Sequence, residues 1–375
     1  MKVLVVANSG WNIKNFREDL IKGLISEGSR VEIASPLDEY VSELKDLGCS
    51  HTRIDFKARG LNPFNELYVF LQTIKIVKNS MPDIILSFTI KPNIYFGLAS
   101  RALNIPIISN ITGLGKNFLT SRIRAYLFRI LYKIALRKVS RCVFQNIYDQ
   151  NYFVNSKIIA KPKAVIISGS GINLKRFMPS KDANKKKIWK KKKFRFLYTG
   201  RIIEDKGILE LLGAAKLIKE DLDIDIKIVG KFEHETVSKK LKQTFNSAIE
   251  SKIIDYHEFV KDIRPQLLSS DCLVQPSYRE GSSRSIMEAM ALGLPVIATD
   301  VPGCNNLVQN DFNGFLCKPK NTLDLYLKMK KVFSLSTKRR KTMGLLGRKI
   351  IEKHHSVDGI VSQYLKVIKK IKLDK

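Results

Sequence analysis

Two cations follow a short apolar run near the middle of the chain. The segment 198–207 reads YTGRIIEDKG, in which the run ends at Gly200 and is followed by Arg201 and Lys206. Gly200 lets the backbone approach a ligand closely, and the two cations supply a forked guanidinium and a compact ammonium. An expected helix start just after them adds outward-pointing amides. This combination favours binding of a diphosphate, although a turn with solvated charges would have the same composition.

Two acidic side chains flank the start of another expected helix, about 75 residues further along. The run EGSSRSIME begins at Glu280 and ends at Glu288. Between them, Gly281, Ser282 and Ser283 suit a helix start, where free amides point outward. A carboxylate accepts several hydrogen bonds and therefore suits a pair of vicinal hydroxyls. The apolar residues around Glu288 indicate a mostly buried helix, which disfavours the alternative of two merely exposed acids.

Alternating apolar strands and amphipathic helices must position these side chains. We expect strands at 2–7, 30–34, 84–88, 107–110, 142–145, 164–168, 194–199, 224–229, 272–275 and 295–299, and helices at 15–27, 208–217 and 357–373. Such alternation is typical of parallel sheets with helices on both faces. The expected fold class is therefore α/β, with two doubly wound, Rossmann-like domains facing a central cleft in which ligands bind at strand ends.

A basic segment separates the two halves of the chain. Residues 181–193 contain eight lysines and one aspartate with almost no apolar periodicity, which is typical of a solvated linker. We therefore expect a first domain over 1–175, a linker over 176–194 and a second domain over 195–355. The remaining residues, 356–375, are expected to form a helix that packs back on the first domain.

Composition narrows the class of protein. Of the 375 residues, 44% are hydrophobic, which suffices for two cores. Every apolar run is shorter than the ~18–20 residues that span a bilayer. The apolar run within residues 1–8 is too short for a signal peptide, and no small-residue cleavage site follows it. Five dispersed cysteines without a C-x-x-C pair indicate reduced thiols and no cysteine-based metal site. A cytoplasmic protein is expected.

The chain is strongly basic. It has 66 Lys and Arg residues against 35 Asp and Glu, a formal charge of +31. Such an excess favours nucleotide phosphates, nucleic acid or an anionic membrane surface. Residues 121–141 place apolar side chains at helical spacing with cations mostly elsewhere, which is typical of a helix at an anionic membrane. An ordinary surface helix is the alternative. We favour the membrane interpretation, with the protein held peripherally at the inner face of the plasma membrane.

Together, the two charged motifs resemble those of the family 4 glycosyltransferases of the GT-B fold. The resemblance covers essentially the whole chain, is strongest over 195–318, and includes the runs Ile172-Asn173 and 301–304, VPGC. It implies transfer of a sugar from a nucleotide donor with retention of anomeric configuration. It also implies that neither a metal nor another cofactor is required.

The resemblance assigns roles to individual residues. Arg201 and Lys206 match the pair that holds the donor diphosphate, Glu280 matches the acid that contacts the donor sugar, and these three are the expected catalytic residues. Glu288 matches the acid that holds the ribose hydroxyls. Gly10 lies in the first strand–helix loop, where family members place glycines against the phosphates, although this chain has one glycine there and not the common pair.

Two loops of the first half look similar to the subgroup that extends lipid-linked oligosaccharides, often with galactose or N-acetylgalactosamine. They follow expected strands and supply Lys91, Asn93 and Thr112 as acceptor-binding candidates. Local hydrogen bonding is an equally favoured interpretation of these residues. The implied donor is a UDP-sugar and the implied acceptor a polyprenyl-diphosphate-linked saccharide, in the assembly of cell-surface polysaccharide or glycan.

Other functions explain less of the sequence. A nucleotide-sugar epimerase of the same fold would need no acceptor, and a nicotinamide-dependent oxidoreductase would require G-x-G-x-x-G after the first strand, which residues 8–10 do not supply. A non-enzymatic polyanion-binding protein would leave Glu280 and Glu288 unexplained, and we expect no nucleic-acid partner. Asp223 and Asp225 imitate a metal-binding D-x-D, but the resemblance does not require a metal there.

Overall fold

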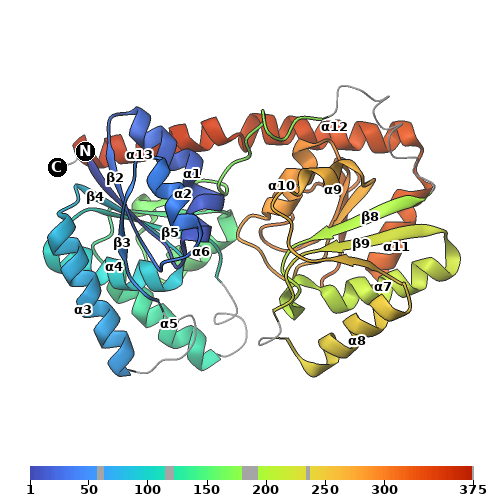
Figure 1. Ribbon diagram of the computed structural model, residues 1–375, viewed down its shortest axis with the longest axis horizontal. Helices are drawn as coiled ribbons and strands as arrows, with labels where there is room; N and C mark the ends of the chain where they lie inside the picture. The colour runs from blue at the N-terminus through green and yellow to red at the C-terminus, as the bar shows by residue number, and fades with distance from the viewer. Residues whose placement is uncertain (57–62, 115–121, 180–192, 234–236, 374–375) are drawn as a thin grey trace. The chain divides into compact units, whose positions relative to one another are not determined.

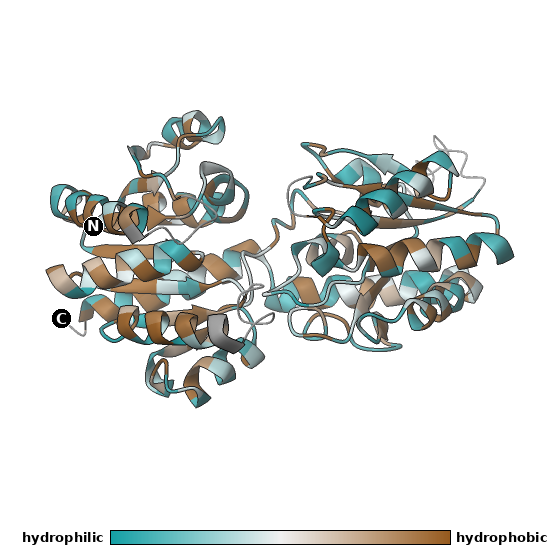
Figure 2. Ribbon diagram, turned by 90° about the horizontal axis from the view of Figure 1, so that it is seen from below, coloured by the Kyte–Doolittle hydropathy of each residue, from teal (hydrophilic) through white to brown (hydrophobic). Residues whose placement is uncertain are grey.

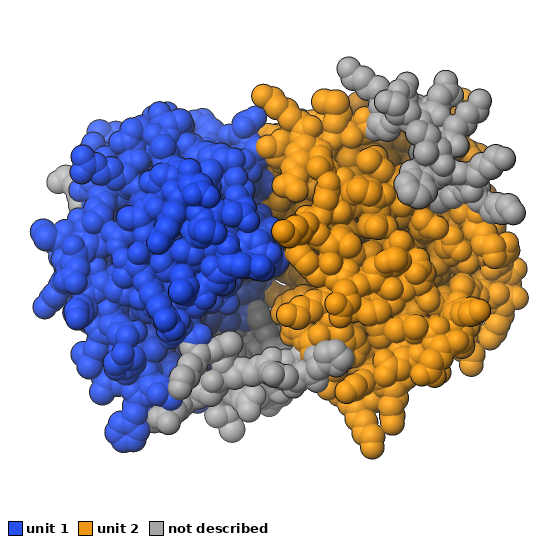
Figure 3. All heavy atoms as spheres, viewed as in Figure 1, with its two compact units in different colours: residues 1–171, 357–375 blue, residues 172–356 orange. Residues whose placement is uncertain are grey.

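The computed structural model describes residues 1–56, 63–114, 122–179, 193–233 and 237–373. The chain forms two compact units, Met1–Gly171 with Val357–Lys375, and Ile172–Ser356 (Figure 3). The first unit thus ends slightly before the boundary expected at 175 and includes the C-terminal helix. Most of the basic linker expected over 176–194 lies outside the described residues.

The first unit is built on a parallel sheet of seven strands. In spatial order these are β3 (Ser50–Arg53), β2 (Arg30–Ser35), β1 (Lys2–Val6), β4 (Ile84–Phe88), β5 (Ile107–Ile111), β6 (Arg141–Phe144) and β7 (Ala164–Ile166). The central strands are almost entirely buried, as expected where helices cover both faces. The strand order reverses between β1 and β4, the kind of switch point at which α/β sheets bind ligands.

Helices from both ends of the chain cover this sheet (Figure 1). They are α1 (Gly10–Ser26), α2 (Tyr40–Asp46), α3 (Pro63–Ser80), α4 (Ile90–Leu103), α5 (Arg122–Ala135), α6 (Ile147–Asn155) and α13 (Val357–Leu373), with a 3₁₀ turn η2 (Lys161–Lys163) before β7. The C-terminal α13 packs on α1, and its Tyr364 hydroxyl donates to Asn110 Oδ1 at 2.7 Å. The last helix is therefore part of the first unit's core.

The second unit repeats this architecture with six parallel strands. In spatial order they are β10 (Asp255–His257), β9 (Ile224–Val229), β8 (Phe194–Thr199), β11 (Cys272–Gln275), β12 (Val296–Thr299) and β13 (Gly314–Cys317). Its helices are η4 (Glu204–Lys206), α7 (Ile208–Asp221), α8 (Lys239–Glu250), α9 (Arg264–Leu268), α10 (Arg284–Ala291), α11 (Thr322–Ser334) and α12 (Thr337–His354). Here the order reverses between β8 and β11.

Both units show the expected α/β class with doubly wound parallel sheets. Many helices are striped in apolar and polar residues (Figure 2), which matches an apolar face on the sheet and a polar face in water. Among the described residues, we find no helix that is both long and apolar enough to cross a membrane.

Candidate functional site

The loop after β8 is fixed by two glycines and a buried tyrosine. Gly200 has a φ of 150°, and a Cβ on Gly230, just after β9, would lie 1.8 Å from the Gly200 carbonyl oxygen. The Tyr198 hydroxyl donates to the Arg201 carbonyl at 2.8 Å. Burial, with the charge of Glu280 adding to it, raises the pKa of Tyr198, so the hydroxyl keeps its proton. The backbone that carries the first cation is therefore rigidly positioned.

Lys206 is aimed by a tight turn. The turn η4 ends at Gly207, whose φ is 68°, and a Cβ there would lie 2.0 Å from the Pro276 carbonyl oxygen. Glycine at this position permits close contact between the β8 loop and the segment after β11. Lys206 Nζ consequently lies 2.5 Å from Glu280 Oε1, and the two side chains are only 16% and 15% exposed. The structure thus joins the two charged motifs that the sequence separates.

Glu280 is held by hydroxyl and amide groups at the ends of β11 and β12. Ser277 Oγ donates to Glu280 Oε1 at 2.8 Å, and Gln275 Nε2 donates to Ser277 Oγ at 2.9 Å. Thr299 Oγ1 donates to the Ser277 carbonyl. The Glu280 backbone N–H donates to the Pro302 carbonyl at 3.0 Å. Within the described part of the chain, Oε2 of this carboxylate accepts no hydrogen bond, so it remains available to a ligand.

The helix start after Glu280 is more buried than the sequence suggests. Gly281 and Ser283 are buried, and Ser282 is half-buried. The Ser283 N–H donates to the Gly303 carbonyl at 3.0 Å, so this amide serves the fold and does not point to a ligand. Gly303 is required here, because a Cβ on it would lie 2.3 Å from the Glu280 carbonyl oxygen. The direct role expected for the Ser283 amide is therefore not supported.

Glu288 lies one turn inside α10 and is 13% exposed. It accepts a hydrogen bond from Arg284 Nε at 2.8 Å. Ser285 Oγ donates to the Thr199 carbonyl at 2.9 Å, which fastens α10 to the carboxyl end of β8. Glu288 therefore stands at the same sheet edge as Lys206. Its partner Arg284 has no role in the sequence-based prediction.

Arg201 differs from the other charged residues because its side chain is 61% exposed. Its Nη1 lies 3.0 Å from Oε1 of Glu233, which follows β9. Exposed ion pairs of this kind contribute little free energy, so a ligand can recruit the guanidinium at small cost. Lys206, Glu280 and Glu288 thus lie together at the carboxyl edge of the second sheet, and Arg201 extends from the same edge.

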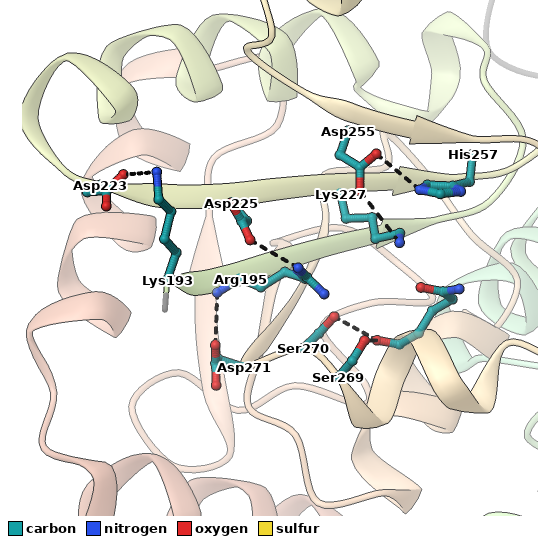
Figure 4. Close-up of polar contacts among 11 residues, drawn as sticks. Lys193, Arg195, Asp223, Asp225, Lys227, Asp255, His257, Ser269, Ser270 and Asp271 are labelled. Carbon is teal, nitrogen blue, oxygen red and sulfur yellow. Dashed lines mark hydrogen bonds and ion pairs between the residues drawn. The ribbon is translucent and has the colours of Figure 1, made fainter. Parts of the chain in front are cut away.

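The D-x-D pattern lies elsewhere in the second unit, at the amino end of β9. Figure 4 shows that each of its carboxylates faces a cation: Asp225 pairs with Arg195 at 3.0 Å, and Asp223 pairs with Lys193. The described residues contain no group of three or more side chains arranged to hold a metal ion. Both aspartates are therefore engaged in ion pairs between neighbouring segments.

Gly10, the glycine expected against the phosphates, begins α1 in the first unit. A Cβ there would lie 2.3 Å from Asp38 Oδ1. The other oxygen of Asp38 accepts the Trp11 N–H at 2.9 Å, and Ser9 Oγ accepts the Asn12 N–H at 3.1 Å. Side chains of the protein itself thus occupy these first-turn amides. Gly10 has a packing reason for being glycine, and its phosphate contact remains a prediction.

Asn93, an acceptor candidate, has a structural role in the first unit. It is fully buried, its Oδ1 accepts a hydrogen bond from Ser87 Oγ at 2.6 Å, and its Nδ2 donates to the Asn110 carbonyl at 2.9 Å. Both ends of the amide therefore join α4 to β4 and β5. We withdraw Asn93 from the acceptor site because it has no surface to offer a ligand.

The other two acceptor candidates are more accessible. Lys91 lies in the first turn of α4, and its Nζ lies 2.8 Å from Glu66 Oε1. Thr112 follows the carboxyl end of β5 and is half-buried. Both remain candidates at the carboxyl edge of the first sheet.

Two helices of the first unit expose apolar stripes. On α5 the exposed side chains are Tyr126, Leu127, Ile130, Leu131 and Ile134, and on α3 they are Phe64, Leu67, Tyr68 and Leu71. Both helices pack against α4. The α5 stripe agrees with the helix expected over 121–141. The α3 stripe was not predicted, because apolar spacing alone does not tell a buried face from an exposed one.

Comparisons with known proteins agree with this geometry. Residues 180–349 match the family described as glycosyl transferases group 1, and residues 2–146 match glycosyl transferase 4-like proteins. The chain is 30% identical over 336 residues to the N,N'-diacetylbacillosaminyl-diphospho-undecaprenol alpha-1,3-N-acetylgalactosaminyltransferase of Campylobacter jejuni, covering 87% of each chain. It is 24% identical over 328 residues to the UDP-Gal:alpha-D-GlcNAc-diphosphoundecaprenol alpha-1,3-galactosyltransferase of Escherichia coli, covering 83% of this chain and 82% of the relative.

Solved structures of similar fold cover the whole chain. A glycosyltransferase from Rickettsia africae has a TM-score of 0.80 at 22% identity, covering 100% of this chain and 99% of its own. Anabaena HepE, solved in complex with UDP-glucose, has a TM-score of 0.82 at 19% identity, covering 99% of this chain and 100% of its own. At these identities the likeness establishes the fold alone. The family matches and the fold together show that this chain is a member of the family 4 glycosyltransferases of the GT-B fold.

Proposed function

We propose that this glycosyltransferase moves a hexose or N-acetylhexosamine, with galactose and N-acetylgalactosamine as first candidates, from a UDP-sugar to a polyprenyl-diphosphate-linked saccharide. The Campylobacter jejuni and Escherichia coli relatives are named for such sugars and for undecaprenyl-diphosphate acceptors. The observation that carries the proposal is the Lys206–Glu280 pair, 2.5 Å apart at the carboxyl edge of the second sheet. We place the reaction in cell-surface polysaccharide or glycan assembly.

The two cations of the loop after β8, Arg201 and Lys206, would stabilise the leaving group. When the bond between the anomeric carbon and the phosphate oxygen breaks, negative charge grows on the nucleotide diphosphate. Lys206 and Arg201 would stabilise that charge more strongly in the transition state than in the bound donor. They would supply the positive charge that a metal ion supplies in other transferases, so we propose that transfer requires no metal.

The pair with Glu280 would orient Lys206 without using up its hydrogen bonds. An ammonium has three N–H donors, so Lys206 can donate to Glu280 and to a phosphate oxygen together. Glu280 Oε1 already accepts from Lys206 and Ser277, while Oε2 is available to a hydroxyl of the donor sugar. One carboxylate would therefore fix both the cation and the sugar.

Glu288 would hold the ribose hydroxyls, with Arg284 orienting its carboxylate through their hydrogen bond. Because Glu288 is engaged with Arg284 and Glu280 with Lys206, we assign neither as a nucleophile. We therefore propose retention through attack by the acceptor hydroxyl on the face from which the diphosphate departs, without a covalent sugar–enzyme intermediate.

A lipid-linked acceptor would place the enzyme at a membrane surface. The exposed apolar stripe of α5 contains Leu127, Ile130, Leu131 and Ile134, at helical spacing, with Arg129 beside it. Apolar side chains that enter the headgroup region, flanked by cations, are typical of peripheral binding to anionic membranes. We propose that the first unit attaches the enzyme to the inner face of the plasma membrane in this way.

A product analysis tests the proposed function. The protein would be incubated with a panel of nucleotide sugars and a polyprenyl-diphosphate-linked saccharide, and products would be identified by mass. We expect addition of one hexosyl or N-acetylhexosaminyl group together with release of UDP. Interconversion of the nucleotide sugar without any acceptor would instead identify an epimerase, and turnover restricted to donors other than UDP-sugars would refute the donor assignment.

A further inference from the structure

A hollow of about 640 Å³ lies on the first unit, away from the carboxyl edge of its sheet. Its walls come from the ends of α4, α5 and α6 and from η2, segments that precede strands β5, β6 and β7. Segments before parallel strands lie at the amino edge of the sheet, opposite the loops that carry Lys91 and Thr112. Leu136, Ile158 and Ile159 are buried beneath the hollow and give it an apolar floor.

The rim of the hollow carries six basic side chains. They are Arg101, Lys133, Arg137, Lys157, Lys161 and Lys163. In the part of the chain that the structure describes, no acidic side chain lines the hollow, and none of the six cations has a side-chain hydrogen bond or ion pair. Like charges brought together repel one another, so such a cluster costs stability unless an anion neutralises it.

Helix dipoles explain part of this cluster. The carboxyl ends of α4 and α5 carry partial negative charge, which favours Arg101 and Lys133 in their last turns. Lys157 lies just past the carboxyl end of α6 and shares this effect, whereas Lys161 and Lys163 lie in the single turn η2, which is too short to build up a comparable dipole. The η2 lysines, and the lack of acidic side chains among the described residues that line the hollow, are left without this explanation, which points to an anionic occupant.

The exposed stripe of α5 runs directly to the hollow. Ile134 is 45% exposed and belongs to both, and Lys133 beside it also lines the hollow. An apolar stripe in the headgroup region would therefore bring the basic rim to the depth at which lipid phosphates lie. A free phosphate or a nucleic acid would use the cations but would leave the adjoining apolar stripe exposed to water.

We propose that this hollow binds the phosphate group of an anionic phospholipid, at a site separate from those for the donor and the acceptor. The proposal rests on the membrane attachment proposed above and adds a defined headgroup site to it. The occupant is a lipid of the bilayer, with its phosphate among the six cations and its acyl chains beside the α5 stripe.

A matched pair of charge variants tests the proposal with the full-length protein. The first replaces Arg101, Lys157 and Lys161 by Gln at the hollow. The control replaces Lys239, Lys240 and Lys242 by Gln at exposed positions of α8 and removes the same charge. Binding would be measured by sedimentation with vesicles of phosphatidylglycerol in phosphatidylcholine and with phosphatidylcholine alone, and folding by thermal unfolding.

We expect the hollow variant to lose at least about tenfold in affinity for the phosphatidylglycerol vesicles, and the control to lose less than about twofold. Equal losses in both variants would show a diffuse charge effect and overturn the proposal, as would unchanged binding in both. A short DNA duplex whose binding falls in the hollow variant, while vesicle binding persists, would also overturn it.

The experiment is independent of the transfer reaction, because vesicle binding needs neither donor nor acceptor. Transfer to a water-soluble, short-chain acceptor should be unchanged in the hollow variant. If the wild-type protein shows no transfer but the vesicle result holds, the proposed function fails and the headgroup site stands. If transfer proceeds and the two variants bind vesicles alike, the headgroup site alone is refuted.

Discussion

The carboxyl edge of the second sheet, which carries Arg201, Lys206 and Glu280 and is called the donor edge below, differs from the basic hollow of the first unit in how its cations are paired. At the donor edge, Lys206 has Glu280 as a partner at 2.5 Å, and Arg201 has Glu233 at 3.0 Å. At the hollow, no described side chain pairs with the six cations. A paired cation has a defined position before a ligand binds. Unpaired cations instead attract an anion through their summed positive electrostatic potential. The first region should therefore be sensitive to geometry and the second to total charge and salt.

The largest expected effect follows from breaking the pair at the donor edge. Glu280→Ala removes both the proposed sugar contact and the group that orients Lys206, so we expect transfer to be abolished, measured as UDP release in the presence of acceptor. Lys206→Arg keeps the positive charge but not the compact geometry of the ammonium, and we expect this variant to retain little activity. A folded Glu280→Ala protein with full activity would contradict the site assignment.

The transfer rate should also depend on the exposed Arg201, but not on its ion-pair partner Glu233. Arg201→Ala is expected to lower the transfer rate about a hundredfold or more, corresponding to roughly 3 kcal/mol of lost charge stabilisation. Glu233→Gln leaves the guanidinium in place, and we expect less than about a threefold change because exposed ion pairs contribute little. Equal losses in the two variants would indicate that the ion pair itself is the functional unit.

A smaller loss is expected from the group that holds Glu280 in position. Ser277→Ala removes a 2.8 Å hydrogen bond to Glu280 Oε1 and leaves Gln275 without an acceptor. We expect the rate to fall about tenfold, consistent with a hydrogen bond to a charged group. The KM for the UDP-sugar and the maximal rate would be measured separately. An unchanged maximal rate would show that the serine serves the fold alone.

Salt should separate the two regions without any substitution. Raising ionic strength from about 0.1 to 1 M shortens the screening length from about 10 to 3 Å. Vesicle binding should then fall steeply, because it relies on unpaired and exposed charges. UDP binding should fall much less, because Lys206 is 16% exposed and, in the proposed donor complex, donates directly to a phosphate oxygen. Equal losses of vesicle binding and UDP binding would contradict the proposed difference between the paired cations of the donor edge and the unpaired cations of the hollow.

The smallest change is expected from the apolar stripe. Ile130→Gln alters a side chain that is 39% exposed, so stability should change by no more than about 0.5 kcal/mol. Vesicle affinity should fall by a few-fold, reflecting lost insertion of one apolar side chain. Ala at the same position is the conservative control and should lie between wild type and Gln. Identical vesicle binding in all three proteins would show that the α5 stripe does not contact the membrane.

The sequence predicted most of the strands that are buried on both faces, although it missed the buried edge strand β13. The expected bounds 84–88, 194–199, 224–229 and 272–275 recur in the structure, as does the helix 357–373. Continuous apolar runs between polar turns carry this signal locally. The edge strands β3 and β10 were missed, because Ser50–Arg53 and Asp255–His257 are polar and partly exposed, and only pairing with a neighbour makes them strands.

The candidate site was predictable in its charges but not in its contacts. The spacing of Arg201 and Lys206 indicated diphosphate binding, because a glycine turn and a helix start flank them, and the family resemblance assigned Glu280 to the donor sugar. Their actual partners lie far away in sequence: Glu233 is separated from Arg201 by 32 residues, and Glu280 from Lys206 by 74. Such contacts depend on strand order, which leaves no local pattern.

Asn93 shows the converse limit of sequence analysis. An amide near a strand end suggests a ligand contact, yet its side chain closes hydrogen bonds between β4, α4 and β5 inside the fold. Burial, which decides between these roles, is a property of the packed unit and not of the local sequence.

UDP binding to matched lysine variants tests the central claim most directly. Calorimetric titration of UDP would compare the wild type with Lys206→Ala and with Lys216→Ala, which removes an exposed lysine of α7 in the same unit. We predict that Lys206→Ala loses at least about tenfold in affinity and that Lys216→Ala binds as the wild type does. Equal UDP affinity in all three proteins would contradict the assignment of the Lys206–Glu280 pair as the donor diphosphate site.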